Sequence, residues 1–402
     1  MAEELDVLIA GGGLVGASLA IALDGARVSV ALAEAVPPRA DLQPSYDERN
    51  LALAGASVNA LRALGVLDDA AAVHPIEHIH VSRRGDFGSV RLDADALALP
   101  AFGATIPARE LGNALLRRLD RADVARLAPA EVIAFDEKDG TIDVTLRTPA
   151  GERRVRTRLL VGADGTESFV RRALGIEVER HEYGQSAFVT TLTTDKPLGT
   201  TAYERFTNSG PVALLPLGAN RAGLVLSVPS AKAAHVDALD DAEFLAFVHE
   251  RFGHRAGRFS RPGRRKPYPL ARVLASRTIA SRVALVGNAA QTVHPIGAQG
   301  FNLGLRDALT LAELVRDSSV RGQDVGGAAL LACYAERRAD DRSATTRFSD
   351  DLVRLMGNDF APLRLLRSLG FHALDRIAPL KRRFALRGMG FRGDTPLLAL
   401  MR

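Results

Sequence analysis

Three glycines near the N-terminus, Gly11, Gly13 and Gly16, constrain the fold of this chain more than any other sequence feature. The apolar run at 5–10 predicts a buried strand before them, and the small apolar residues at 17–23 predict a helix after them. In this context the glycines allow a tight turn, let the backbone approach a pyrophosphate, and let the helix pack closely on the strand. The helix N-terminus offers free N–H groups and a positive dipole to the phosphates. The pattern therefore predicts a Rossmann-like βαβ unit that binds a dinucleotide.

Glu34 ends a second strand predicted over 27–34, and it lies 21 residues after Gly13. A carboxylate at this place can accept hydrogen bonds from both hydroxyls of a ribose, and it would repel a 2′-phosphate. The segment is therefore typical of a site for FAD or NAD and disfavours NADP. A second match to the glycine pattern, at 388–393, has no strand before it, so we interpret it as a coincidence.

Two further turns follow predicted strands. Asp164 follows the strand expected at 158–161 and can accept hydrogen bonds from sugar hydroxyls, although an ordinary turn with a capping acid gives the same pattern. Asn288 follows the strand expected at 283–287. The glycine-rich stretch 297–304 beyond it can direct backbone N–H groups at an anion, and a reduced flavin is such an anion.

Hydrophobic patterning changes in the middle of the chain. After residue 176 the sequence is rich in Thr, Val, Phe and Tyr, and strands expected at 211–216 and 223–228 are separated by turns, as in an antiparallel sheet. Near residue 280 the alternation of strand and helix returns. We therefore expect an α/β fold in three parts: a discontinuous Rossmann-like domain (1–175 plus 276–360), an inserted, mainly antiparallel β-sheet domain that binds substrate (176–275) and a C-terminal helical tail (361–402).

Composition excludes several classes of protein. A single cysteine, Cys333, excludes a disulfide-rich scaffold and a multi-cysteine metal site. The pair His78 and His80 lacks a third ligand nearby, and the basic loop 261–266 lacks aromatic partners, so we expect neither a metal nor a nucleic acid to bind. An acidic start and the absence of an apolar run of about 18 residues indicate a cytoplasmic protein without a spanning helix.

The glycine turn, the Asp164 turn and the segment 286–307, in this order, resemble the aromatic-ring hydroxylase branch of flavoprotein monooxygenases, of the para-hydroxybenzoate hydroxylase type. The segments that narrow this resemblance to the ubiquinone-biosynthesis ring hydroxylases, most closely to the 2-polyprenyl-6-methoxyphenol hydroxylases, are 46–53, 202–206, 210–217 and 287–291. The resemblance spans about residues 4 to 395. Its motifs are specific for flavin binding and much less specific for the ring carbon that is oxidised.

The resemblance implies FAD as the cofactor and assigns residues to it. The ADP half would be held by Gly11, Gly13, Gly16 and Glu34. Contacts to the flavin, its pyrophosphate or its ribityl chain would come from Arg49, Arg109, Asp164 and Asn288, the last standing where the wider superfamily has Asp. The isoalloxazine would be bordered by Pro295, Gly300, Phe301 and Asn302.

The resemblance also implies a reaction. NAD(P)H, or another electron donor, reduces FAD, oxygen adds to give the C4a-hydroperoxide, and this transfers OH to the phenol ring of a polyprenylated ubiquinone precursor, 2-polyprenyl-6-methoxyphenol. A base that deprotonates the phenol would help, and His294, beside Pro295, or His181 could serve; a structural role is the alternative for each. The function alternatives are hydroxylation at another ring position, a flavin reductase of the same fold, and a non-catalytic subunit of a quinone-synthesis complex.

The tail 361–402 carries nine Arg and Lys against two Asp, a net charge of +7 in a chain whose total is +5. Pro362 and Pro379 divide it into short helices. One helical face would hold apolar side chains, namely Leu363, Leu366, Leu369, Leu374, Ile377, Leu380 and Phe384. Such a basic amphipathic helix can lie on an anionic membrane surface, here the cytoplasmic face of the inner membrane, or its apolar face can pack on the body of the protein. Other ubiquinone-biosynthesis proteins are further possible partners.

Overall fold

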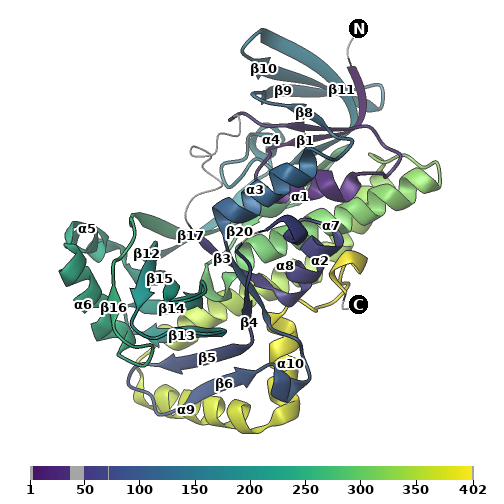
Figure 1. Cartoon of the computed structure of the whole chain (residues 1–402). Helices are drawn as coiled ribbons and strands as arrows, with labels where there is room; N and C mark the ends of the chain where they lie inside the picture. Colours follow the sequence, from purple (N-terminus) through teal and green to yellow (C-terminus); the bar gives the residue numbers. More distant parts are fainter. Residues whose placement is uncertain (1–2, 37–48, 71, 401–402) are drawn as a thin grey trace.

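The structure, a computed structural model of the chain, describes residues 3–36, 49–70 and 72–400. These residues form three β-sheets, of eight, nine and three strands, and the helices that cover them. In Figure 1 the eight-stranded sheet lies at one end of the molecule and the nine-stranded sheet towards the other. The long helices α7 (Gln299–Val320) and α8 (Ala328–Gly357) run between them.

The eight-stranded sheet is built around β1 (Glu3–Ala10). β1 pairs in parallel with β2 (Val30–Ala33) on one side and with β11 (Gly151–Gly162) on the other, and β19 (Val283–Leu285) continues the parallel order beside β11. Helix α1 (Leu14–Leu23) makes the crossover from β1 to β2, which confirms the predicted Rossmann-like unit. The other strands of this sheet are β8 (Ala125–Leu127), β18 (Ile279–Ala280) and the hairpin β9 (Glu131–Lys138) and β10 (Thr141–Thr148).

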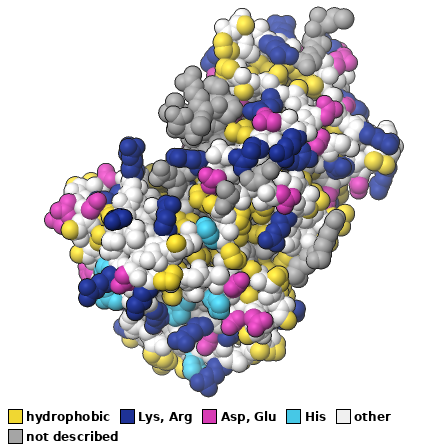
Figure 2. All heavy atoms as spheres, viewed as in Figure 1, with side chains coloured by type: hydrophobic (Ala, Val, Ile, Leu, Met, Phe, Trp, Pro, Cys, Tyr) yellow, Lys and Arg dark blue, Asp and Glu magenta, His cyan; other side chains and the backbone are white. Residues whose placement is uncertain are grey.

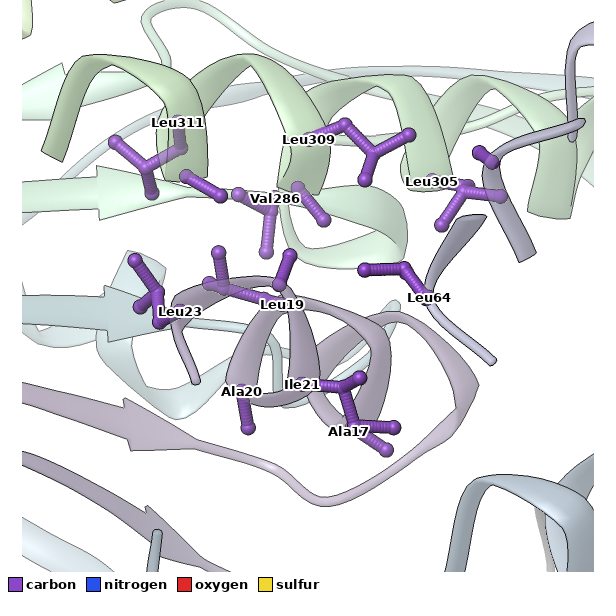
Figure 3. Packing of buried hydrophobic residues seen from close by; sticks show 14 of the residues in the cluster. Ala17, Leu19, Ala20, Ile21, Leu23, Leu64, Val286, Leu305, Leu309 and Leu311 are labelled. Carbon is purple, nitrogen blue, oxygen red and sulfur yellow. The ribbon is translucent and has the colours of Figure 1, made fainter. Parts of the chain in front are cut away.

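The core of this domain lies where α1 packs against α7. Leu19 and Leu23 of α1 point towards Leu309 and Leu311 of α7 in Figure 3. The close approach depends on Gly304 of α7, because a Cβ there would lie 2.9 Å from the Cγ2 of Val15 on α1. The same core is covered further by α2 (Gly55–Ala63) and α3 (Ala108–Leu119).

The nine-stranded sheet contains the predicted antiparallel region and extends beyond it. Its strands, in spatial order, are β20 (Gln291–Thr292), β17 (Pro267–Ala275), β12 (Val178–Thr194), β15 (Arg221–Pro229), β14 (Gly210–Pro216), β13 (Thr201–Thr207), β5 (His78–Arg83) and β6 (Ser89–Asp93), with β16 (Phe259–Ser260) beside β12. The division predicted at residue 176 assigns β5 and β6 to the first domain, whereas β5 pairs in parallel with β13. A pairing between segments so distant in the sequence leaves no local pattern that could predict it.

Helices cover both faces of the nine-stranded sheet. One face packs on α5 (Ser230–Ala238) and α6 (Asp241–Phe252), where Asp240 and Glu243 form a capping box. The other face packs on α8, α9 (Ala361–Arg376) and α10 (Ala378–Gly388). A three-stranded sheet of β3 (Asn50–Ala54), β7 (Gly103–Pro107) and β4 (His74–Ile76) completes the described strands.

The tail forms the two short helices that its prolines predict, α9 and α10. α9 lies along β6, and its Phe371 is buried in the core on that side of the sheet (Figure 1). Leu366 and Leu369, on the same helix, are 64% and 51% exposed. The tail therefore packs on the body and still presents apolar side chains to solvent. Within the described residues no helix combines the length and the hydropathy needed to cross a membrane.

Candidate active site

The predicted cofactor motifs meet at one edge of the eight-stranded sheet. In the pairing register Ala10 of β1 stands beside Ala33 of β2 and Gly162 of β11, and Gly162 stands beside Leu285 of β19. These four residues are the last of their strands. The motifs that follow them are the glycine turn 11–16, Glu34, Asp164 and Asn288. Open parallel sheets bind ligands outside the carboxyl ends of their strands, so this edge is the candidate site.

The glycine turn has no room for side chains. Gly11 has a φ of 106°, and a Cβ there would lie 2.5 Å from the carbonyl oxygen of Ala163. A Cβ at Gly16 would lie 2.0 Å from the carbonyl oxygen of Gly11. Gly13 caps α1 without a side-chain hydrogen bond, which leaves N–H groups of the first turn to a ligand. This cradle fits the pyrophosphate of FAD.

The Glu34 carboxylate lies directly against the glycine turn. Its Oε2 accepts a hydrogen bond from the backbone N–H of Gly12 at 2.6 Å, and its Oε1 accepts one from the N–H of Val36 at 2.8 Å. The two bonds hold the carboxylate beside the predicted pyrophosphate cradle, where it fits the ribose of the ADP half.

Asp164 has one carboxylate oxygen engaged and one available. Its Oδ2 accepts from the N–H of Val170 at 3.1 Å, while the buried Oδ1 has no hydrogen-bond partner among the described residues. Ser168 caps the helix α4 (Phe169–Ala173) by accepting from the N–H of Arg171. An acceptor left unpaired at the sheet edge fits a hydroxyl or water of the bound cofactor.

Asn288 is exposed in the short turn Gly287–Ala289 at the same edge. Asp307 of α7 holds this turn in place. The N–H of Gly287 donates to its Oδ2 at 3.2 Å, and the side chain of Gln291 donates to the same oxygen at 2.5 Å. A neutral carboxamide there can accept from a ribityl hydroxyl without adding charge.

Asp307 belongs to a buried ion network that the sequence analysis missed. Its Oδ1 accepts from Arg338 at 2.8 Å, and Arg338 and Arg306 both donate to Asp341, at 2.8 and 2.6 Å. Burial alone would raise the pKa of Asp341, but the two guanidinium groups outweigh it and hold the pKa at about 2. The network ties α7 and α8 to the Asn288 turn. A run of ordinary helical charges gives no signal of it, since the pairing depends on how two helices meet.

The segment from His294 to Gln299 turns back on itself before α7 begins. Gly297 and Ala298 are both left-handed, with φ of 64° and 52°, and the non-glycine residue in that conformation stores strain of a kind typical of functional loops. Nδ1 of the fully buried His294 accepts from the N–H of Ile296 at 3.2 Å. Nδ1 is therefore unprotonated, and Nε2–H donates to Oε1 of Gln185 at 3.3 Å. Burial lowers the pKa of His294 to about 4, so both ring nitrogens are committed in a neutral ring that holds the loop.

The other predicted loop residues take different places. Pro295 is exposed, and a Cβ at Gly300 would meet nothing within 4 Å, so both border open space. Phe301 is half-buried against the core. Asn302 uses its side chain within the protein: it accepts from the N–H of Ala54 at 2.9 Å and donates to the carbonyl oxygen of Ala52 at 3.0 Å. It thereby fastens α7 to β3.

Arg49 and Arg109 lie at the same end of the three-stranded sheet, since the N–H of Ala108 donates to the carbonyl oxygen of Arg49 at 2.8 Å. Both side chains are exposed, and each also interacts with other residues of the chain. The residues Tyr46 to Glu48, part of the resemblance, lie outside the described residues.

The other histidines that the sequence analysis considered have different surroundings. His181 is exposed on β12, with its ring 5.1 Å from that of Tyr183. His80 is buried beside Arg255, and burial together with that guanidinium lowers its pKa to about 4. His78 lies 3.8 Å from Asp93. In the described ranges no three His, Cys, Asp or Glu side chains are grouped so that they could share a metal.

Comparison with known proteins agrees with this geometry. The family model described as "FAD binding domain" matches residues 4–349. The chain is 39% identical to the ubiquinone hydroxylase UbiL of Rhodospirillum rubrum over 96% of its length and 89% of that protein. It is 32% identical to the 3-demethoxyubiquinol 3-hydroxylase of Escherichia coli over 94% of its length and 97% of that protein.

Two solved structures resemble the whole fold. The p-nitrophenol 4-monooxygenase PnpA of Pseudomonas putida superposes with a TM-score of 0.81 at 20% identity, over 98% of this chain and 99% of that one. PqsL of Pseudomonas aeruginosa, in complex with 2-aminobenzoylacetate, superposes with a TM-score of 0.75 at 26% identity, over 92% of this chain and all of that one. With FAD as its cofactor, the chain belongs to the FAD-binding-domain family of monooxygenases and, within it, to the hydroxylases of ubiquinone biosynthesis.

Proposed function

We propose that the chain hydroxylates the phenol ring of a polyprenylated ubiquinone precursor, and that this precursor is 2-polyprenyl-6-methoxyphenol. The likeness to ubiquinone hydroxylases extends over nearly the whole chain, including the nine-stranded sheet, and it carries the proposal. Bound FAD would supply the activation of oxygen, with NAD(P)H as the proposed electron donor. The glycine turn, Glu34, Asp164 and Asn288 would hold it at the sheet edge.

The protein's own contribution is to position the phenol ring against the cofactor and to exclude water from it. The His294–Asn302 loop borders the predicted isoalloxazine site, and its Ile296 belongs to the same apolar cluster as the neighbouring face of the nine-stranded sheet. A phenol ring lying on that face would be held against the cofactor in a dry environment, where a reactive oxygen species is protected from side reactions.

Deletion of the gene, followed by mass spectrometry of the quinone pool, tests the proposed substrate. We expect 2-polyprenyl-6-methoxyphenol to accumulate. Accumulation of a demethoxyubiquinone would instead favour the ring position that the name of the E. coli relative indicates. The purified FAD-loaded enzyme should incorporate one atom of ¹⁸O₂ into the product, and reduction of the substrate without oxygen uptake would show a flavin reductase.

We also propose that the tail places the enzyme on an anionic membrane surface, where a polyprenylated substrate resides. Exposed Leu366 and Leu369 on α9 supply apolar contact. On α10, Arg382, Arg383 and Arg387 line a groove of about 750 Å³ together with Leu97, Leu386 and Phe391. Apolar side chains beside several arginines suit a lipid surface with negative headgroups. In Figure 2, by contrast, Lys and Arg are scattered among acidic side chains over much of the face in view.

Sedimentation of the FAD-loaded enzyme with vesicles tests this placement. We expect binding to vesicles that contain phosphatidylglycerol, weaker binding in high salt, and loss of roughly fivefold in affinity for each of Arg382→Gln and Arg383→Gln, since a basic residue near such a surface contributes about 1 kcal/mol. Leu366→Ser should weaken binding further, and Val320→Ser, at a 72% exposed position of α7, is the matched control. Unchanged binding of the tail variants would contradict the proposal.

A further inference from the structure

Glu204 is a carboxylic acid on an otherwise apolar part of the nine-stranded sheet. Its neighbours in β13, Tyr203 and Arg205, face α6: the Tyr203 ring lies 5.8 Å from that of Phe252, and the charge of Arg255, the residue that contacts His80, acts on Arg205. Side chains alternate along a strand, so Glu204 points to the opposite face. That face is covered by α8 and lies towards the His294–Asn302 loop, which we call the flavin loop because it borders the predicted isoalloxazine site.

The side chains around Glu204 are apolar and only half-buried. In the sheet register Glu204 stands beside Val81 of β5 and Ala213 of β14, and Ala213 stands beside Val225 of β15. Each of these positions is half-buried, whereas Phe206, next on the same face of β13, is buried. The Glu204 carboxyl is therefore surrounded by partly accessible apolar side chains on a sheet face that a helix covers.

The same face reaches the flavin loop. Ile296 of the flavin loop is in one hydrophobic cluster with Phe206 and Ala202, the two residues that flank Glu204 on its face of β13. Met356 of α8 joins the same cluster. Glu204 therefore belongs to the wall that faces the flavin loop, on the side where a ring substrate would lie.

No described side chain neutralises Glu204 or donates a hydrogen bond to it. The charged groups near this face have partners elsewhere: Arg83 bonds Asp86 and Asp359, at 3.2 and 2.5 Å, and Asp350 of α8 accepts from Tyr183 and Arg272. His294 is neutral, and Arg354 of α8 is exposed. Burial raises the pKa of Glu204 to about 7, where the acid and its carboxylate are equally populated at neutral pH.

We propose, on the basis of the ring-hydroxylase function proposed above, that Glu204 is the base that accepts the proton of the substrate's phenol hydroxyl. The O–H bond breaks, its electron pair stays on the phenol oxygen, and the ring becomes richer in electrons at the carbons ortho and para to it. When the ring has gained its oxygen atom, the displaced ring hydrogen leaves as a proton to solvent and Glu204 returns its own proton to the phenol oxygen. A base poised near the working pH is the most effective in such a transfer.

Glu204→Gln keeps the size of the side chain and removes its basicity, and Glu204→Asp keeps the acid. The assay uses FAD-loaded enzyme, NADH, oxygen and 2-prenyl-6-methoxyphenol, with hydroxylated product as the readout. We expect turnover of the Gln variant to fall about 100-fold at pH 7 and the Asp variant to retain more. Wild-type turnover should fall as pH drops below about 7, and this limb should be absent in the Gln variant. The absorption spectrum of bound FAD should not change, and Glu131→Gln, on the exposed strand β9, is the control.

A second measurement needs no turnover. Because the folded-state pKa of Glu204 lies above its ordinary value, ionisation destabilises the fold, so stability is lost as pH rises from about 4.5 through 7. The melting temperature of Glu204→Gln should therefore exceed that of the wild type by a margin that grows over this range. A constant margin, or a Gln variant with the wild-type pH profile of turnover, would overturn the assignment of Glu204. If the margin in melting temperature grows with pH but the wild-type enzyme forms no hydroxylated product, the proposed function is overturned instead.

Discussion

Gly16→Ala is expected to yield a protein that no longer retains FAD. The added Cβ would lie 2.0 Å from the carbonyl oxygen of Gly11, far inside van der Waals contact, and backbone atoms cannot give way there without opening the turn. The pyrophosphate cradle and the first turn of α1 would separate from the end of β1. The measurement is the flavin absorbance per protein after gel filtration.

Gly370→Ala is the matched control for that substitution. Gly370 lies within α9, and a Cβ there would meet nothing within 4 Å, so FAD content should stay unchanged and helix propensity should if anything stabilise the fold. Full FAD occupancy in Gly16→Ala would show that the cofactor does not lie at this turn.

Asp341→Ala is expected to lower the free energy of unfolding by about 3–5 kcal/mol, the usual effect of removing one partner from a buried ion pair. Arg306 is 2% exposed, and Asp341 is its only ion-pair partner among the described residues. Its guanidinium would be left buried and unpaired. Urea unfolding at pH 7 measures the change, and Glu131→Ala, which breaks the exposed pair with Arg147, should cost less than about 1 kcal/mol.

The loss of unfolding free energy caused by Asp341→Ala should become smaller as pH falls. The two guanidinium groups hold the folded-state pKa of Asp341 at about 2, below the ordinary value of 3.8. Its contribution is therefore complete above about pH 4 and is lost as pH falls towards 2. The difference between wild type and variant should shrink between pH 5 and pH 3. An equal difference at both pH values would show that Asp341 is not the group that titrates.

Local patterns were sufficient wherever neighbours in the sequence are neighbours in the structure. The turn at Gly11–Gly16 and the two prolines that start the tail helices depend on short-range sterics and hydrogen bonds, and the structure has each where it is predicted. The carboxyl ends of parallel strands meet at one edge by geometry, so the predicted motifs come together as well.

Asn302 and His294 show where such reasoning is insufficient. Both belong to the flavin-loop motif. The side chain of Asn302 nevertheless hydrogen-bonds to the backbone of β3, and the two ring nitrogens of His294 hydrogen-bond to Ile296 and Gln185. A motif identifies the residues of a site, but it does not separate those that face a ligand from those that hold the loop, because this depends on partners supplied by other strands.

The sequence by itself determined the dinucleotide cradle, the parallel unit around it and the family, because these follow from glycine sterics, strand and helix periodicity and motif order. The tertiary structure alone decided that β5 and β6 join the nine-stranded sheet, that Arg306, Arg338, Asp307 and Asp341 form one buried network, and what covers the side of that sheet on which Glu204 lies. These features arise between segments far apart in the chain. Their energies come from desolvation and pairing after the segments have met, and no local pattern records them.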